Sequence, residues 1–146
     1  MDFFDLKKGD SVCTQKIVDD LTYKVVGAAI RVQQGMKPGV KEAVYEECLT
    51  IELDRLGIPY RQQFSFRPTY RGQLLKSTSV VDLIVDDLLI VELKAVKAIL
   101  PIHMAQALNY INLLGLPKAL ILNFNSINIA TEGRKTVVNS VYAELW

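Results

Sequence analysis

Apolar residues recur at helical spacing in two stretches near the beginning of the chain. In the first stretch these positions are Leu21, Val25, Ala28, Ala29 and Val32. Such spacing predicts a helix with one apolar face, which Asp19 or Asp20 can cap and which ends at Gly35. A second apolar stripe, followed by Gly57, predicts another helix over about residues 40–56.

The middle of the chain instead shows the patterns of β-strands. Aromatic residues alternate with polar ones over residues 60–70, which predicts a strand with one apolar face. Residues 79–85 and 89–93 are rich in Val, Ile and Leu and do not alternate cleanly. Strands of that kind are covered on both faces, as in the middle of an α/β sheet.

The remaining elements complete an α/β order. A helix is expected over about residues 102–114, and a further strand over residues 119–124. Residues 127–146 are expected to hold a short strand and a final helix. The order α-α-β-β-β-α-β predicts one α/β domain over residues 18–146, preceded by an N-terminal tail over residues 1–17.

Composition limits the classes of function. A chain of 146 residues suits one domain with a single core. The net charge of +1 lacks the basic excess of proteins that coat long nucleic acids. Two cysteines and one histidine match no zinc-site spacing. No apolar run reaches the ~18–20 residues of a membrane span, and the first residues lack a signal-peptide pattern, so we expect a cytoplasmic protein with no membrane partner.

Ionic residues within the two apolar strands are the candidates for chemistry. Asp82 lies within the run Val-Val-Asp-Leu-Ile-Val, and Glu92 and Lys94 are two residues apart in the following strand. Because side chains alternate along a strand, Glu92 and Lys94 share a face. Charged residues are rare in buried strands unless they are paired or bind a metal ion.

The length of the loop between these strands decides where Asp82 points. With a two-residue loop, Asp82 opposes Val91 and points away from Glu92. With a three-residue loop over residues 86–88, Asp82 opposes Glu92 directly. The two carboxylates would then have Cβ atoms ~5 Å apart and would repel each other unless a cation such as Mg²⁺ or Mn²⁺ joins them.

Each candidate also has a simpler interpretation. Lys94 beside a metal ion can orient water and stabilise charge on a phosphate, yet Glu92 and Lys94 also fit a half-exposed ion pair at a strand end. Gln106 and Tyr110, four residues apart on one helix face, can contact a substrate or position water, or Gln106 can simply solvate that face. Glu42 near a helix N-terminus is favoured by the helix dipole even without a function.

The order of these motifs resembles a known family. Asp82 followed by Glu92-Leu93-Lys94 is similar to the core of the PD-(D/E)xK nuclease superfamily. The run Gly39-Val40-Lys41-Glu42-Ala43-Val44-Tyr45 resembles the pattern that names the bacterial GxxExxY family. With VVDLIV, VELKAV and LILNFN in order, the resemblance covers about residues 21–139. Val81 stands where the superfamily's name places a proline.

The resemblance implies a fold and a metal site. The fold would be restriction-endonuclease-like, a mixed β-sheet flanked by helices in the order αβββαβ. Asp82 and Glu92 would bind Mg²⁺ or Mn²⁺, with the Leu93 carbonyl as a further ligand and Glu42 in support. Lys94 would activate or orient the attacking water.

The same resemblance implies the remaining roles and the function. Gln106 would match the superfamily's motif glutamine on the helix after the strands and would belong to the catalytic residues. Tyr110 and Tyr45 would position the substrate. The expected function is a Mg²⁺-dependent nuclease that hydrolyses phosphodiester bonds in DNA or RNA. Two alternatives stay open: a non-catalytic nucleic-acid- or partner-binding module on the same fold, and a defence or repair subunit active only inside a complex. A homodimer or a larger complex is also open as the assembly.

Overall fold

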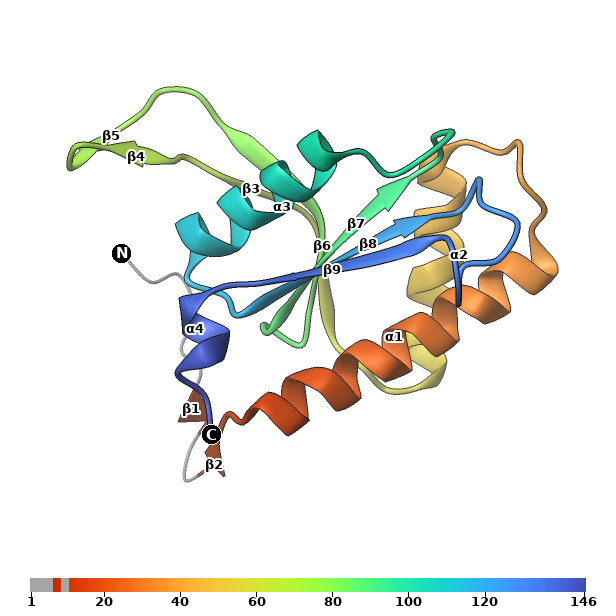
Figure 1. Ribbon diagram of the computed structural model, residues 1–146, viewed down its shortest axis with the longest axis horizontal. Coiled ribbons are helices and arrows are strands. Elements are labelled where there is room, and N and C mark those ends of the chain that lie inside the picture. Colours follow the sequence, from red (N-terminus) through yellow and green to blue (C-terminus); the bar gives the residue numbers. More distant parts are fainter. Residues whose placement is uncertain (1–6, 9–10) are drawn as a thin grey trace.

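The centre of the protein is a mixed five-stranded β-sheet. The computed structural model describes residues 7–8 and 11–146 of the chain. In spatial order the strands are β3 (Tyr60–Phe66), β6 (Ser79–Val85), β7 (Leu89–Lys94), β8 (Lys118–Asn123) and β9 (Arg134–Val138). Strands β7 and β8 run parallel, and the other neighbouring pairs of this sheet are antiparallel (Figure 1). A parallel pair needs a crossover connection, which a helix provides here.

Helices pack on both faces of this sheet. Helices α1 (Gln15–Gly35) and α2 (Glu42–Arg55) cover one face, and α3 (Pro101–Leu114), the crossover between β7 and β8, covers the other (Figure 1). The short elements are α4 (Ser140–Ala143) and the strand pairs β1 (Lys7–Lys8) with β2 (Ser11–Val12) and β4 (Thr69–Tyr70) with β5 (Gln73–Leu74). None of the helices in the described part of the chain combines the length and apolar character that a membrane span requires.

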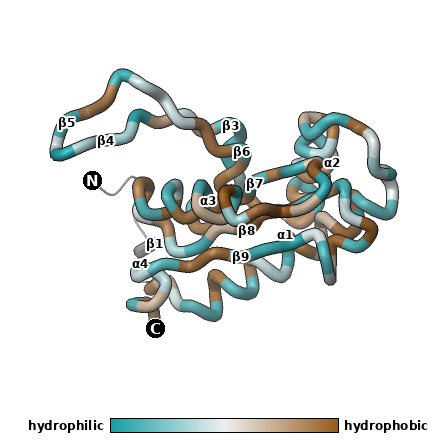
Figure 2. Tube along the Cα trace, turned by 45° about the horizontal axis from the view of Figure 1, so that its top comes forward, coloured by the Kyte–Doolittle hydropathy of each residue, from teal (hydrophilic) through white to brown (hydrophobic). Residues whose placement is uncertain are grey.

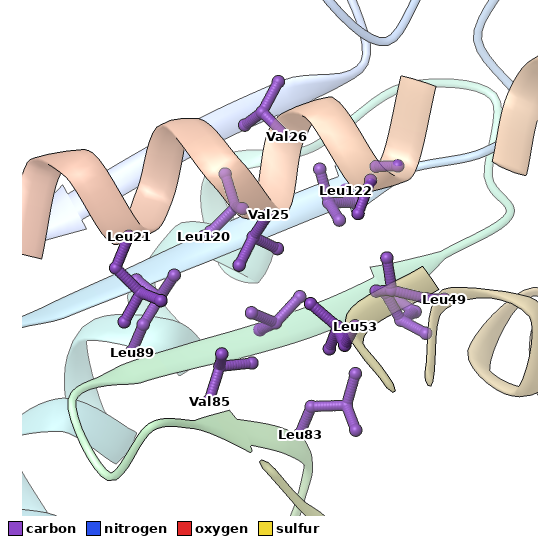
Figure 3. Packing of buried hydrophobic residues seen from close by; sticks show 14 of the residues in the cluster. Leu21, Val25, Val26, Leu49, Leu53, Leu83, Val85, Leu89, Leu120 and Leu122 are labelled. Atoms are coloured by element: carbon purple, nitrogen blue, oxygen red, sulfur yellow. The ribbon is translucent and has the colours of Figure 1, made fainter. Parts of the chain in front are cut away.

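Hydrophobic residues gather on the central strands (Figure 2). Their side chains form two apolar layers, one on each face of the sheet. On the side of α1 and α2, Leu83 and Leu89 pack with helical residues such as Leu49 (Figure 3). On the side of α3, Ile84 and Ile90 belong to the second layer. Consecutive strand residues thus point into opposite layers and both faces are buried, as the non-alternating sequence predicts. Burial of each such side chain contributes roughly 1.5–3 kcal/mol.

The predicted element order is confirmed, while the predicted start of the first helix is wrong. Elements α2, β3, β6, β7, α3 and β8 follow one another as α-β-β-β-α-β. Thr14 caps α1 in place of Asp19 or Asp20, because its hydroxyl accepts a hydrogen bond from the Ile17 N–H at 3.2 Å. The Asp19 carboxylate instead accepts a hydrogen bond from the Lys118 ammonium at 3.1 Å.

Two other predicted boundaries differ from the observed ones. The first turn of α1 lies within the tail predicted over residues 1–17, of which residues 1–6 and 9–10 lie outside the described residues. Strand β3 ends earlier than the strand predicted over residues 60–70. Pro68, which has no N–H to donate to a sheet, separates β3 from β4.

Candidate active site

The β6–β7 hairpin fixes the position of the acidic residues. Its last ladder pair before the turn is Val85↔Leu89, so the loop has three residues, 86–88. Asp86 and Asp87 adopt left-handed backbone conformations with φ of 51° and 53°, which aspartate tolerates better than most residues. Of the two loop lengths that the sequence allows, the protein has the three-residue one.

Asp82 and Glu92 face one another just beyond the last ladder pair at the other end, Leu83↔Val91. The Asp82 N–H donates a hydrogen bond to Glu92 Oε1 at 3.2 Å, and the Leu93 N–H donates one to Asp82 Oδ2 at 2.8 Å. Each carboxyl group thus accepts a hydrogen bond from a backbone N–H beyond the end of the ladder. Strands β6 and β7 run apart beyond this point (Figure 1), with Asp82 on β6 and Glu92 on β7, and we call this opened end of the hairpin the gap.

Glu92 is a buried carboxyl group, with 6% of its surface exposed. Burial, and next the negative charge of Asp82, raise the pKa of Glu92 from its ordinary 4.5 to about 8, against the opposing effects of the Asp82 N–H and the Lys94 charge. Two adjoining carboxyl groups are stable together only when a proton or a cation lies between them. Hard oxygen donors on neighbouring strands fit a divalent cation such as Mg²⁺ or Mn²⁺.

Lys94 ends β7 on the same face as Glu92. Its positive charge lowers the pKa of Glu92, yet it forms no salt bridge with any residue in the described part of the chain. The alternative of a half-exposed ion pair therefore does not describe these two residues, since Glu92 is buried.

Glu42 reaches the end of β7 from the first turn of α2. Its Oε1 accepts a hydrogen bond from the Ala95 N–H at 3.0 Å, and its side chain is exposed. Within residues 7–8 and 11–146, no three side chains of Asp, Glu, His or Cys come close enough to share a metal ion. The structure thus brings Asp82 and Glu92 together without Glu42.

The backbone of Leu93 adds an oxygen to the gap. The Leu93 N–H points toward β6, where it donates to Asp82. Because the N–H and C=O of one strand residue point to the same side, the Leu93 carbonyl also faces β6. The carbonyl therefore lies beside the two carboxyl groups, where the resemblance places a further ligand.

Helix α3 carries the next two candidate residues, Gln106 and Tyr110. Gln106 Nε2 donates a hydrogen bond to the Tyr110 hydroxyl at 3.1 Å, so the four-residue spacing brings the two side chains into contact. Burial, and next the negative charge of Glu92, raise the pKa of Tyr110. The Phe66 ring of β3 meets the Tyr110 ring edge-on, with centroids 6.0 Å apart.

Tyr45 is enclosed in the protein interior, which corrects the expectation that it positions a substrate. Its side chain is 1% exposed and its ring stacks on Phe124 with centroids 4.6 Å apart. Its hydroxyl donates a hydrogen bond to the Lys37 carbonyl at 2.9 Å. A side chain enclosed in this way is a packing residue that fastens α2 to the sheet.

Gln63 and Glu46 belong to the site although the sequence did not point to them. Gln63 has a left-handed backbone with φ of 47° within β3, and the ladder between β3 and β6 skips this residue. Its Nε2 donates to Glu46 Oε1 at 2.6 Å and to Asp82 Oδ1 at 3.4 Å. One signal in the sequence could have found Gln63, the alternation of side chains along a strand. Gln63 falls opposite Asp82 once the register of β3 against β6 is known.

Comparison with known proteins assigns the family. A family model described as the PD-(D/E)XK nuclease superfamily matches residues 19–136, which is more than half of the chain. The chain belongs to the PD-(D/E)XK nuclease superfamily, and its mostly antiparallel sheet between helices is the restriction-endonuclease-like fold. No curated protein and no solved structure is significantly similar to the chain.

Proposed function

We propose that the chain is a metal-dependent nuclease of the GxxExxY branch of its superfamily, which hydrolyses phosphodiester bonds in nucleic acid with Mg²⁺ or Mn²⁺. The observation that carries the proposal is the crossed pair of hydrogen bonds that sets Asp82 and Glu92 side by side in the gap. Lys94 on the same face and the motif over residues 39–45 support it.

The oxygen atoms around the gap would hold the cation. Asp82 and Glu92 would each contribute a carboxylate oxygen, and the Leu93 carbonyl would contribute a third. Glu92 would release its proton on binding, because a ligating carboxyl group is ionised. Glu42 would support the site from the end of β7. When bound, a divalent cation polarises the phosphate and lowers the pKa of a nearby water.

The side chains around the acids would serve the hydrolysis itself. In that reaction the water oxygen forms a bond to phosphorus and gives up one proton to the solvent, one P–O ester bond breaks, and the departing oxygen takes up a proton. The Lys94 ammonium would orient the attacking water and stabilise the negative charge that grows on the phosphate. The Gln106 amide would donate a hydrogen bond to the substrate, and Tyr110 would limit where the substrate can lie.

A cleavage assay tests the proposed function. Labelled single- and double-stranded DNA and RNA are incubated with the chain and Mn²⁺ or Mg²⁺, beside Asp82→Ala and the surface control Asp20→Ala. We expect cleavage by the wild type and by Asp20→Ala that EDTA stops. We expect none by Asp82→Ala, because that variant lacks one of the two carboxylates.

Two outcomes contradict the proposal. Equal cleavage by Asp82→Ala would mean that the activity comes from a contaminant or from another site. Tight binding of nucleic acid by the wild type without cleavage under any condition would instead favour a binding module on the same fold.

A further inference from the structure

The hairpin of β3 and β6 continues beyond the central sheet as a narrow arm. After the pair Phe66↔Ser79, the chain forms the short ribbon β4–β5, paired as Thr69↔Leu74. Figures 1 and 2 both show this ribbon standing out from the body of the molecule. We call residues 67–78 the arm; apart from the half-buried Pro68, all of its residues are exposed.

The arm carries a concentration of positive charge. Between Asp54 and Asp82 the sequence contains no acidic residue, and the arm includes Arg67, Arg71 and Lys76. The whole chain has a net charge of only +1, so this charge is local. A local basic element beside a catalytic site is the electrostatic pattern of a phosphate-binding surface.

The arm has a defined shape. Arg67 Nε donates a hydrogen bond to the Leu75 carbonyl at 2.6 Å, and the Leu75 N–H donates one to the Pro68 carbonyl at 2.9 Å. Arg71 and Lys76 form no salt bridge with the residues that the structure describes. Their charges are therefore not neutralised within that part of the chain and are presented on an ordered ribbon.

The arm begins close to the acidic pair. It joins β6 at Ser79, three residues before Asp82. An extended chain rises about 3.3 Å per residue, so Lys76 lies up to about 20 Å from Asp82. A phosphodiester held at Asp82 and Glu92 would belong to a nucleic acid whose neighbouring phosphates come within reach of the arm.

We propose that the arm docks duplex DNA beside the acidic pair, an inference that rests on the proposed nuclease function. Two paired strands about 4.8 Å apart fit a B-form major groove about 12 Å wide. Duplex RNA offers a deep and narrow major groove that side chains do not enter. Single-stranded binding surfaces are grooves with several stacking aromatic side chains, whereas the arm carries one aromatic residue, Tyr70, on a protruding ribbon.

Binding measured without cleavage tests the arm. The affinity for a fluorescent 30-base-pair DNA duplex is measured by anisotropy in EDTA over a series of salt concentrations. The variant is Arg71→Ala with Lys76→Ala, and the matched control is Lys24→Ala with Arg55→Ala, which removes the same charge from exposed positions on α1 and α2. Circular dichroism verifies that both variants are folded.

We expect the arm variant to lose two phosphate contacts. The slope of log K against log salt should fall in magnitude by about 2, and affinity should fall roughly tenfold per lost charge at 0.1 M salt. The control should bind like the wild type. An equal loss in both variants, an unchanged affinity in the arm variant, or no duplex binding by the wild type would overturn the inference.

The same titrations on duplex RNA and on single-stranded DNA identify which nucleic acid the arm binds. The loss of affinity should be largest for duplex DNA, and an equal or larger loss for duplex RNA or for a single strand would show that duplex DNA is not the ligand of the arm. Because binding is measured without a metal ion, this result is independent of cleavage. If the wild type cleaves nucleic acid and the arm variant binds as tightly as the wild type, the role of the arm is refuted alone. If the arm variant binds more weakly but the wild type does not cleave, the nuclease function is refuted alone.

Discussion

Asp82 and Glu92 each accept a hydrogen bond from the backbone of the other's strand, Asp82 from the Leu93 N–H and Glu92 from the Asp82 N–H. These bonds hold the two carboxyl groups next to each other. Their mutual repulsion is relieved by a proton on Glu92, whose pKa is raised to about 8. Stability, pH and cation binding are therefore linked through one carboxyl group.

The metal-free protein should lose stability as pH rises from about 4.5 to about 8. Unfolded Glu92 ionises near 4.5, while folded Glu92 keeps its proton until about 8. The folded state binds more protons over that interval, so the free energy of unfolding falls with pH and levels off above about 8. Urea unfolding in EDTA at a series of pH values measures this slope, which Glu92→Gln should flatten.

The control for this slope is Glu47→Gln, at an exposed position on α2. It should keep the wild-type pH dependence, because Glu92 is unchanged in this variant. The same slope in Glu92→Gln and in the wild type would mean that Glu92 is ionised in the folded protein at neutral pH.

Mg²⁺ or Mn²⁺ should raise the melting temperature through the acidic pair. A cation at 100 times its Kd stabilises a folded protein by about 2.7 kcal/mol, which raises Tm by roughly 5–10 °C for a chain of this size. Asp82→Asn should reduce the increase, because it removes one charged ligand. Calorimetry with and without metal measures it. Asp20→Asn serves as the control, and an equal response of both variants places the cation elsewhere.

Lys94→Ala should separate catalysis from metal binding. An ammonium does not bind a cation, so isothermal titration should give a metal affinity near that of the wild type. Cleavage should slow by ~10²–10³, the usual loss when one group that stabilises the transition state is removed. Asp82→Ala should lose both properties, and Lys97→Ala, at a neighbouring exposed position, should lose neither. Cleavage by Lys94→Ala at the wild-type rate would refute the role given to Lys94.

Gln106→Ala should reduce cleavage less than Lys94→Ala does. The Gln106 amide carries no charge and can only position water, substrate or the Tyr110 hydroxyl. The variant should also raise the pKa of Tyr110 further, because the hydrogen bond from Gln106 lowers it. Cleavage kinetics and ultraviolet titration of the tyrosines measure the two effects. The exposed Gln34→Ala is the control, and a loss as large as that of Lys94→Ala would give Gln106 a more direct part in the chemistry.

Local patterns predict the element order because hydrophobic periodicity is a property of each segment. The cap of α1 shows where that local information ends. Asp19 is a good capping residue by type, yet its carboxylate pairs with Lys118, which is 99 residues away in sequence. A contact of that range leaves no trace in the residues beside the helix. The sequence pattern therefore did not predict that α1 begins earlier, at Gln15, with Thr14 as its cap.

The same distinction applies to the site. Strand parity places Glu92 and Lys94 on one face within a single segment, which sequence reasoning can resolve. The partner of Asp82 depends on the length of one loop, and two lengths fit the sequence. The burial of Tyr45 depends on its stacking against Phe124, the residue that follows the end of β8. Motif membership alone could not show that Tyr45 is enclosed.

Gln63 gives the last test, because it combines an unfavourable backbone with two contacts to acids. Gln63→Gly should be more stable than Gln63→Ala by about 1 kcal/mol, since glycine adopts a φ of 47° without strain. Both variants lose the amide that holds Asp82, so both should cleave more slowly than the wild type and to a similar degree. Urea unfolding and single-turnover cleavage measure the two properties separately. The control is Gln62→Ala, since Gln62 also donates to Glu46, at 3.1 Å, and is not among the residues bonded to Asp82. If Gln63→Gly is both more stable and faster in cleavage than Gln63→Ala, Gln63 only supports the conformation of the strand. If the two variants cleave equally slowly despite their different stabilities, Gln63 positions Asp82.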